Sequence, residues 1–270
     1  MSKRKILYIC QQITPYIPEN EESSLCRNLS QAMQERGNEI RTFMPRYGCI
    51  NERRNQLHEV IRLSGMNLII DDTDHQLIIK VASIPAARIQ VYFIDNDDYF
   101  ARKAVLQDAD GSDFADNDER MVFFARGVLE TVKKLRWTPD VIHCHGWFSA
   151  IAPVYLRKVF GDEPIFSNAR IVISLYGDRF GGELDAGMRA KIESEGVKGE
   201  NMALLDHPSY ENLYRYVMTH VDGVVAGSAD ADAGVLAFAR ESGKAVLEYR
   251  SPDDADFYEN YDRFYEELFV

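Results

Sequence analysis

The stretch NDERMVFFARGVLETVKKLRWTPDVIHCHGW, residues 117–147, contains two different hydrophobic periodicities in succession. In its first part, apolar residues such as Met121 and Phe124 recur at helical spacing, which predicts a helix over 117–135. Its second part contains DVIHC (140–144), a short and nearly continuous apolar run that is typical of a strand buried on both faces. A helix followed by a buried strand is the repeating unit of a parallel α/β sheet.

The same alternation continues over the rest of the chain. It predicts an α/β fold, with a Rossmann-like, doubly wound and mostly parallel sheet in a single domain, residues 1–270. Several strands in succession predict a β-hairpin insertion around 56–100. The predicted strands are 4–10, 39–44, 68–71, 76–82, 89–94, 140–144, 170–175, 221–226 and 244–248, and the predicted helices are 22–36, 117–135, 147–160, 208–219, 230–242 and a C-terminal helix 256–269.

Composition restricts the class of protein. The chain has 270 residues, 46% hydrophobic and 27% charged, and a formal net charge of −12. The negative charge argues against nucleic-acid partners, which require clustered Lys and Arg. No run of about 18 apolar residues is present, which predicts no membrane span, and the N-terminal apolar run is too short for a signal peptide. Four widely spaced cysteines without a CxxC pair indicate a reducing compartment. We therefore expect a cytoplasmic location.

Polar residues follow the predicted strand 140–144. Ligands bind at the carboxyl ends of strands in such sheets, which makes His143 and His145 candidates, and the strand period places both imidazoles on one face. We find no third ligand at a recognisable spacing and so predict no metal site. We expect instead a hydrogen-bonded core His143 and a crevice His145 that can bind a sugar hydroxyl. Trp147 offers a face for sugar stacking, and packing at the start of the next helix is the alternative.

The turn after the first strand is TPYIPENEESSLCRNL, residues 14–29, and it contains no glycine. Neither G-x-G-x-x-G nor G-x-x-x-x-G-K-[ST] occurs in the chain, so we expect no nucleotide cofactor of those kinds. The three glutamates Glu19, Glu21 and Glu22 would repel a diphosphate. Alternatively, they favour the start of helix 22–36 through the helix dipole. On either interpretation the loop is not built for phosphate, and a ligand here would be a neutral sugar.

Several motifs occur in the order found in bacterial glycogen and starch synthases: KILYICQQITPY, RGNEIRTFMPRYG, VYFIDNDDYF, the run from FADNDER to PDVIHCHGW, and VDGVVAGS. The chain resembles the N-terminal catalytic lobe of these glucosyltransferases over about 1–250, most specifically over 91–156. The resemblance implies the GT-B architecture, in which two Rossmann-like lobes transfer glucose from a nucleotide-glucose to an α-1,4-glucan without a metal. The donor lobe of that family is expected to be missing from this chain.

The chain also departs from the family pattern. The family has P-x-x-K-x-G-G-L after the first strand. In this chain Pro18 occupies the lysine position, and Asn20 and Glu21 occupy the two glycine positions. Glu19 lies between Pro18 and Asn20. In H-x-H-D-W-H the aspartate position is Gly146. No catalytic residue is assigned, and no cofactor is expected. The candidate substrate-binding residues are His145, Trp147, Asp116, Asn117 and Tyr176, and the degenerate loop is Pro18, Glu19, Asn20 and Glu21.

Asp116 also has a structural interpretation. It directly precedes the predicted helix 117–135, and Glu119 follows three residues later, which predicts a capping box at the start of that helix.

Three functions remain open from the sequence. The first is a glycogen/starch synthase-like glucosyltransferase domain that is inactive alone and is completed by a donor-lobe protein. The second is a non-catalytic domain that binds an α-glucan or small neutral sugar and regulates a full-length synthase. The third is a scaffold that forms a homo-oligomer through the aromatic segment DFYENYDRFYEELF at 256–269, although in this architecture such a helix more often packs on its own domain.

Overall fold

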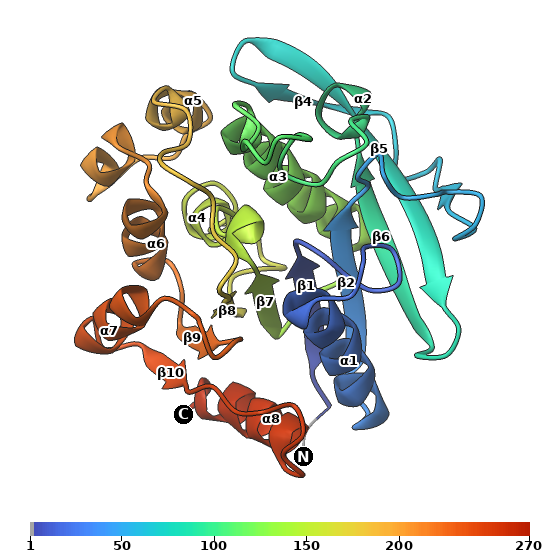
Figure 1. Cartoon of the computed structure of the whole chain (residues 1–270), viewed down its shortest axis with the longest axis vertical. Helices are drawn as coiled ribbons and strands as arrows, with labels where there is room; N and C mark the ends of the chain where they lie inside the picture. The colour runs from blue at the N-terminus through green and yellow to red at the C-terminus, as the bar shows by residue number, and fades with distance from the viewer. Residues whose placement is uncertain (1–2) are drawn as a thin grey trace.

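A computed structural model describes residues 3–270, which form one large sheet between two layers of helices (Figure 1). The strands are β1 (Lys5–Cys10), β2 (Glu39–Pro45), β3 (His58–Glu59), β4 (Met66–Ile70), β5 (Thr73–Ile84), β6 (Ile89–Asp95), β7 (Val141–His145), β8 (Arg170–Leu175), β9 (Gly223–Ala226) and β10 (Ala245–Leu247). The α-helices are α1 (Glu21–Glu35), α2 (Asp97–Phe100), α3 (Asn117–Leu135), α4 (Ala152–Lys158), α5 (Met188–Ser194), α6 (Tyr210–Met218), α7 (Ala233–Glu241) and α8 (Phe257–Glu267), and the 3-10 helices are η1 (Trp147–Ser149) and η2 (Met202–Asp206).

The sheet has the strand order β10-β9-β8-β7-β1-β2-β6-β5-β3, and β4 pairs with β5 outside this path. Every pair from β10 to β6 is parallel, whereas β5 is antiparallel to β6, β4 and β3. The chain passes from β1 to β2 on one side and later returns to β7 on the other side of β1. The strand order therefore reverses between β1 and β7, where doubly wound sheets bind ligands. The predicted α/β fold with a mostly parallel sheet is confirmed.

Some predicted elements differ in extent. The predicted helix 147–160 is divided into η1 and α4, with Pro153 in the first turn of α4. The predicted strand 76–82 is part of the longer β5, because its polar beginning pairs with β4 across the tight turn between Ile70 and Thr73. The segment 177–206, which lacks clear periodicity, contains the short helices α5 and η2.

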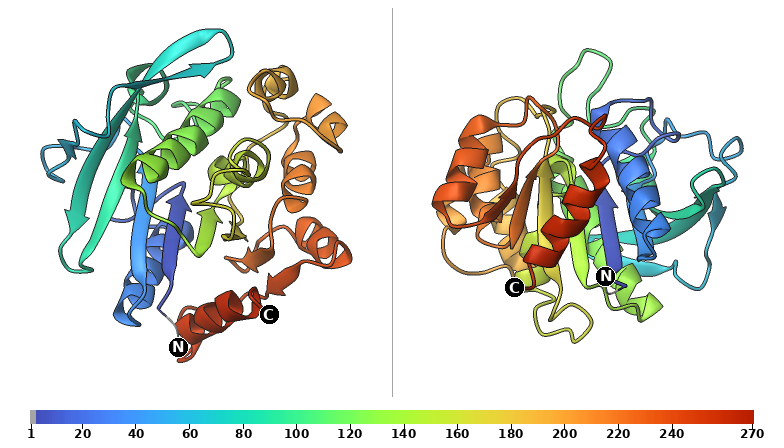
Figure 2. Two further views of the ribbon diagram at one scale, coloured as in Figure 1. Left: turned by 180° about the vertical axis from the view of Figure 1, so that it is seen from behind. Right: turned by 90° about the horizontal axis from the view of Figure 1, so that it is seen from below.

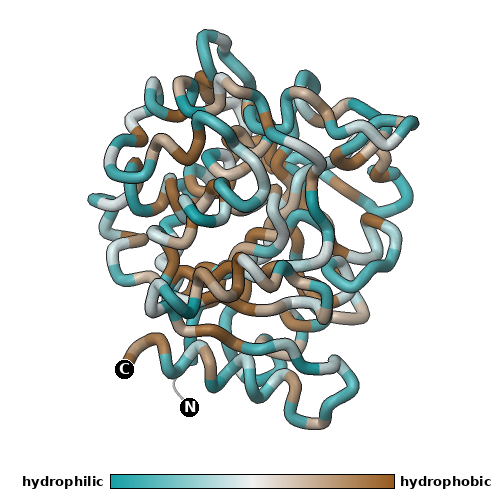
Figure 3. Tube along the Cα trace, turned by 60° about the vertical axis from the view of Figure 1, so that its left-hand side comes forward, coloured by the Kyte–Doolittle hydropathy of each residue, from teal (hydrophilic) through white to brown (hydrophobic). Residues whose placement is uncertain are grey.

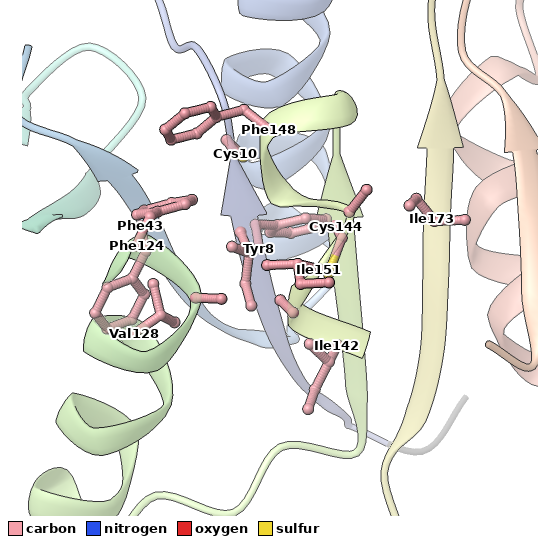
Figure 4. Packing of buried hydrophobic residues seen from close by; sticks show 14 of the residues in the cluster. Tyr8, Cys10, Phe43, Phe124, Val128, Ile142, Cys144, Phe148, Ile151 and Ile173 are labelled. Carbon is pink, nitrogen blue, oxygen red and sulfur yellow. The ribbon is translucent and has the colours of Figure 1, made fainter. Parts of the chain in front are cut away.

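The two faces of the sheet are covered by different helices. α1 and α8 lie side by side on one face, and α3 and α4 cover the other (Figure 1, Figure 2). Hydrophobic residues concentrate along the central strands, while hydrophilic residues mark the outer loops (Figure 3). The core around β1 and β7 is close-packed, with Ile142, Cys144 and Phe124 among its buried side chains (Figure 4). Among residues 3–270, none of the helices is both long and apolar enough to cross a bilayer.

The aromatic C-terminal helix α8 packs against its own domain. Arg4 forms ion pairs of 3.0 Å with Asp262 and 2.9 Å with Glu266, and the Tyr265 hydroxyl lies 2.6 Å from Nδ1 of His143. Four aromatic side chains of the helix are buried: Phe257, Tyr261, Phe264 and Tyr265. The aromatic residues that suggested an interface therefore pack within this domain.

The capping box predicted at the start of α3 is wrong. The Asp116 side chain accepts no hydrogen bond from the described first-turn amides of α3. Its carboxylate instead pairs with the guanidinium of Arg102, and Glu119 accepts a hydrogen bond of 3.0 Å from the Tyr99 hydroxyl. The guanidinium of Arg102, from the loop before α3, and the hydroxyl of Tyr99, from α2, therefore bind the two carboxylates that a capping box would use.

The fully buried guanidinium of Arg120 in α3 holds the loop before α3 in place. Its Nε donates to the carbonyl oxygen of Tyr99 (2.9 Å), and its two terminal nitrogens donate to Asn117 Oδ1 (2.6 Å) and the carbonyl oxygen of Val105 (2.8 Å). Burial lowers the pKa of Arg120 to about 10, so the guanidinium stays charged at neutral pH. The rings around it are Tyr47, Phe100, Phe114 and Phe148.

Arg120→Met should lower the free energy of unfolding by about 3 kcal/mol, because two buried acceptors and one partly buried acceptor lose their donor. Urea unfolding at pH 7 measures this change. The control is Arg263→Met, since Arg263 is exposed and, among residues 3–270, pairs only with Glu259 one helical turn away; its effect should stay within about 0.5 kcal/mol. Equal effects in the two variants would contradict the role given to Arg120.

Candidate functional site

Gln11, the first residue after β1, joins the ends of the central strands. Its side-chain oxygen accepts from the backbone N–H of Phe148 (2.9 Å), and its Nε2 donates to Asp178 (2.8 Å). Its own backbone N–H donates to the carbonyl oxygen of His145 (3.2 Å), and its carbonyl oxygen accepts from the Tyr47 hydroxyl (3.1 Å). Gln11 is fully buried. The turns after β1, β2, β7 and β8 are therefore tied together where the strand order reverses.

Two adjoining hollows of about 310 and 320 Å³ open at this edge of the sheet and share Gln12 and Asp178. We call them together the acidic crevice. Six lining residues are acidic, and the one basic residue, Arg179, pairs with Asp232 at 2.7 Å. The crevice therefore carries a negative potential. The first hollow is lined by Gln12, Val105, Leu106, Gln107, Asp108, Asp113, Trp147, Asp178 and Arg179, and the second by Gln12, Asn20, Glu21, Glu22, Tyr176, Gly177, Asp178 and Asp230.

Glu22 lies at the floor of the second hollow. It is only 3% exposed, and neither carboxylate oxygen has a hydrogen-bond partner among residues 3–270. Burial and then the charge of Asp178 raise its pKa well above the ordinary value, and the nearby amides of Gln11 and Gln12 oppose this rise only in part. Glu22 is thus a buried acid and not a solvated helix-start glutamate. The burial of Glu22 could be predicted from its spacing in the sequence, since Glu22 lies on the apolar face of α1 together with Leu25 and Leu29.

The space for Glu22 is opened by Gly146. This glycine has φ = +78°, and a Cβ at its position would lie 2.7 Å from both Gln11 Oε1 and Glu22 Oε1. Position 146 is where the synthase pattern has an aspartate. In this chain position 146 has no side chain, and the carboxylate beside it is that of Glu22 from α1.

The degenerate loop ends in a helix cap. The Asn20 side chain accepts from the backbone N–H of Ser23 (2.8 Å), and the Ser23 hydroxyl accepts from the backbone N–H of Asn20 (2.9 Å), so each satisfies the other. α1 begins at the next residue, Glu21. Asn20 and Glu21 line the crevice, whereas Pro18 and Glu19 are exposed outside it.

The two histidines of β7 share one face, with ring centroids 4.0 Å apart. His143 lies between the Tyr265 hydroxyl and the Ser174 hydroxyl (2.7 Å), as a hydrogen-bonded core residue. His145 is 0% exposed, and its Nδ1 lies 2.7 Å from the Tyr176 hydroxyl. Burial lowers the pKa of His145 to about 3, which keeps the ring neutral. Contrary to expectation, His145 does not face the open crevice, because Tyr176 lines the second hollow in its place.

The other predicted residues serve mainly the framework. Trp147 is 2% exposed and packs edge-on against Phe180 at 4.9 Å, so its ring face is not open for a sugar. Asn117 is fully buried and donates to the carbonyl oxygen of Leu106 (2.9 Å). Asp116 is held by its ion pair with the preceding loop. The sequence did not identify Gln12, Glu22, Asp178 or Asp230 as residues of the crevice.

Glu22→Gln should stabilise the protein more at pH 8 than at pH 5. The pKa of folded Glu22 is raised above its ordinary value of 4.5, so the stabilising contribution of its protonated form is complete below that value and is lost as the pH rises through the folded pKa. Glutamine keeps the shape without the charge. Urea midpoints at both pH values measure the effect, with exposed Glu19→Gln as the control. A lower midpoint of Glu22→Gln at pH 8 would show that the buried charge is favourable.

Comparison with known proteins identifies the family of this chain. The family model of the starch synthase catalytic domain matches residues 5–239. The glycogen synthase of Chlorobium luteolum is 36% identical over 216 residues, which are 79% of this chain and 43% of that protein. The glycogen synthase of Chlorobium limicola is 36% identical over 173 residues, covering 64% of this chain and 35% of that protein. The chain spans less than half the length of these curated relatives.

A solved structure has the same fold. The catalytic domain of starch synthase IV from Arabidopsis thaliana, bound to ADP and acarbose, superposes with a TM-score of 0.72 at 17% identity, over 92% of this chain and 51% of that chain. At this identity the likeness shows the fold alone. With the family model covering most of the sequence, however, the chain belongs to the starch synthase catalytic domain family and forms one Rossmann-like lobe of that glycosyltransferase fold.

Proposed function

We propose that this domain binds a neutral α-glucan in the acidic crevice and does not by itself transfer glucose from a nucleotide donor. The observation that carries this proposal is the charge of the crevice, where six acidic residues face a single arginine that is already paired. The chain is a synthase-type domain by family, and its crevice is suited to hydroxyl groups.

The electrostatics favour an uncharged ligand. Carboxylates accept hydrogen bonds from sugar hydroxyls, and the amides of Gln12 and Asn20 both donate and accept. A nucleotide diphosphate would meet Glu21 and Asp230 without a compensating lysine or glycine-rich turn, and like charges at such distances repel. The reciprocal cap of α1 further occupies a helix N-terminus that could otherwise hold a phosphate.

The affinity of such a site depends on hydrogen bonds more than on stacking. Trp147 contributes only part of one wall, because Phe180 covers its ring. Gln12 is the best-placed polar residue, since it lines both hollows and its Oε1 accepts from Asn20 Nδ2 at 2.8 Å. A glucan chain lying across Gln12 would contact both hollows.

Titration calorimetry with maltoheptaose tests the proposal. The parent should give saturable heat at millimolar sugar, and Gln12→Ala should weaken binding about fivefold, as expected for the loss of one hydrogen bond worth about 1 kcal/mol. The matched control is Gln31→Ala, because the Gln31 side-chain amide on α1 donates to Glu35 (2.9 Å) outside the crevice. Absence of heat with the parent, or equal affinity of the parent and Gln12→Ala, would refute glucan binding in this crevice.

A second function, transfer completed by another protein, is favoured by family membership and by the fold that this lobe shares with the starch synthase IV catalytic domain. An assay of ADP or UDP release from the nucleotide-glucose, with maltoheptaose as acceptor, separates the two functions. The purified chain alone should release no nucleotide above the blank. Release by the chain alone would overturn our proposal, and release only after addition of a full-length synthase or a donor-lobe protein would establish the second function.

A further inference from the structure

We propose that Cys10, Cys26 and His145 bind one thiophilic divalent metal ion of the zinc class beneath the acidic crevice. One potential ligand atom from each residue lies within 4.8 Å of those of the other two. All three residues are fully buried. This site is independent of the proposed glucan binding.

The three ligands come from different elements that the sheet holds together. Cys10 ends β1 and is paired in register with His145, which ends the neighbouring parallel strand β7. Figure 4 shows Cys10 at the carboxyl end of β1, beside the turn that carries Phe148. Cys26 lies in the second turn of α1, which covers the same face of the sheet. The backbone therefore fixes the ligand positions before any ion binds, which is a requirement for a precise metal site.

The histidine is oriented as a metal ligand is. Its Nδ1 is engaged by the Tyr176 hydroxyl at 2.7 Å, while Nε2 has no hydrogen-bond partner within the described part of the chain. When Nδ1–H donates to the tyrosine oxygen, the lone pair of Nε2 is left for an ion. A ligating histidine characteristically donates its other ring N–H to a neighbouring acceptor. A buried polar atom without a partner is costly in an apolar core, and metal coordination would satisfy it.

The donor set selects the metal. Two cysteine sulfurs and one imidazole nitrogen suit Zn²⁺ or a similar soft ion, whereas Mg²⁺ and Ca²⁺ require oxygen ligands. On binding, each thiol loses one proton to solvent and forms one sulfur–metal bond, so two protons are released for each ion. The two thiolates then balance the double positive charge, which allows the ion to remain buried.

The acidic crevice gives a metal ion a route to the three ligands and attracts it electrostatically. Tyr176, which holds His145, also lines the second hollow, and Glu22, one helical turn before Cys26, forms its floor. Both oxygens of Glu22 lack a hydrogen-bond partner among the described residues, so a polar side chain lies one helical turn from Cys26. A crevice lined by acidic groups concentrates cations at its floor.

Titration of the reduced, chelator-treated chain with Co²⁺ and then Zn²⁺ tests the site. We expect one equivalent of Co²⁺ to give the intense visible bands of a four-coordinate ion and a sulfur-to-metal charge-transfer band, and Zn²⁺ to displace it. About two protons should be released per ion in weakly buffered solution. Cys26→Ala and His145→Gln should weaken Zn²⁺ binding by at least about tenfold, measured by competition with a chromogenic chelator.

Cys144→Ala is the matched control. Cys144 is also fully buried and is adjacent to His145 in sequence, but the strand alternation turns it to the opposite face of the sheet. It should bind Zn²⁺ as the parent does. The parent titration stands even where a variant fails to fold. A parent without the charge-transfer band, equal weakening by Cys144→Ala and Cys26→Ala, or a mass showing a Cys10–Cys26 disulfide in the chain as purified would overturn the proposal.

Discussion

The functional edge of this domain depends on the hydrogen bonds of one buried amide residue, Gln11. The backbone of Gln11 donates one hydrogen bond and accepts one, and its side chain does the same. These four hydrogen bonds connect the turns after β1, β2, β7 and β8. Parallel strands alone fix the direction in which these turns leave the sheet, but not their mutual distance. Gln11 sets that distance, and so it determines how close Asp178 comes to the carboxylate of Glu22. The acidic character of the crevice follows from this fixed geometry.

Much of the fold could be predicted from the sequence, because buried parallel strands are short apolar runs whose identity depends little on their neighbours. The run at 140–144 is an example, and β7 occupies Val141–His145. The exposure of individual side chains at the strand ends could not be predicted in the same way. Trp147 is covered by Phe180, 33 positions later in the chain, and Asp116 is taken by Arg102 from a loop without periodicity. Such contacts depend on tertiary packing that no local pattern records.

The candidate metal ligands illustrate the same limit. Sequence spacing reveals a metal site when its ligands lie on one short segment, as two histidines separated by one residue do. Here the second and third ligands come from β1 and α1, more than a hundred residues before His145 in the chain. Only the register between β1 and β7 brings Cys10 opposite His145. The burial of Glu22, by contrast, could have been predicted, because a glutamate on the apolar face of an amphipathic helix lies against the core.

The relation between Gly146 and Glu22 has a consequence for how this lobe can change over evolutionary time. A side chain at position 146 would collide with the carboxylate of Glu22, and an aspartate there would also place two negative charges in contact. Removing Glu22 alone would leave a void lined by polar atoms. The two positions are therefore coupled, because a side chain at position 146 requires a smaller residue at position 22. Paired substitutions at positions 22 and 146 should therefore be tolerated more readily than either substitution alone.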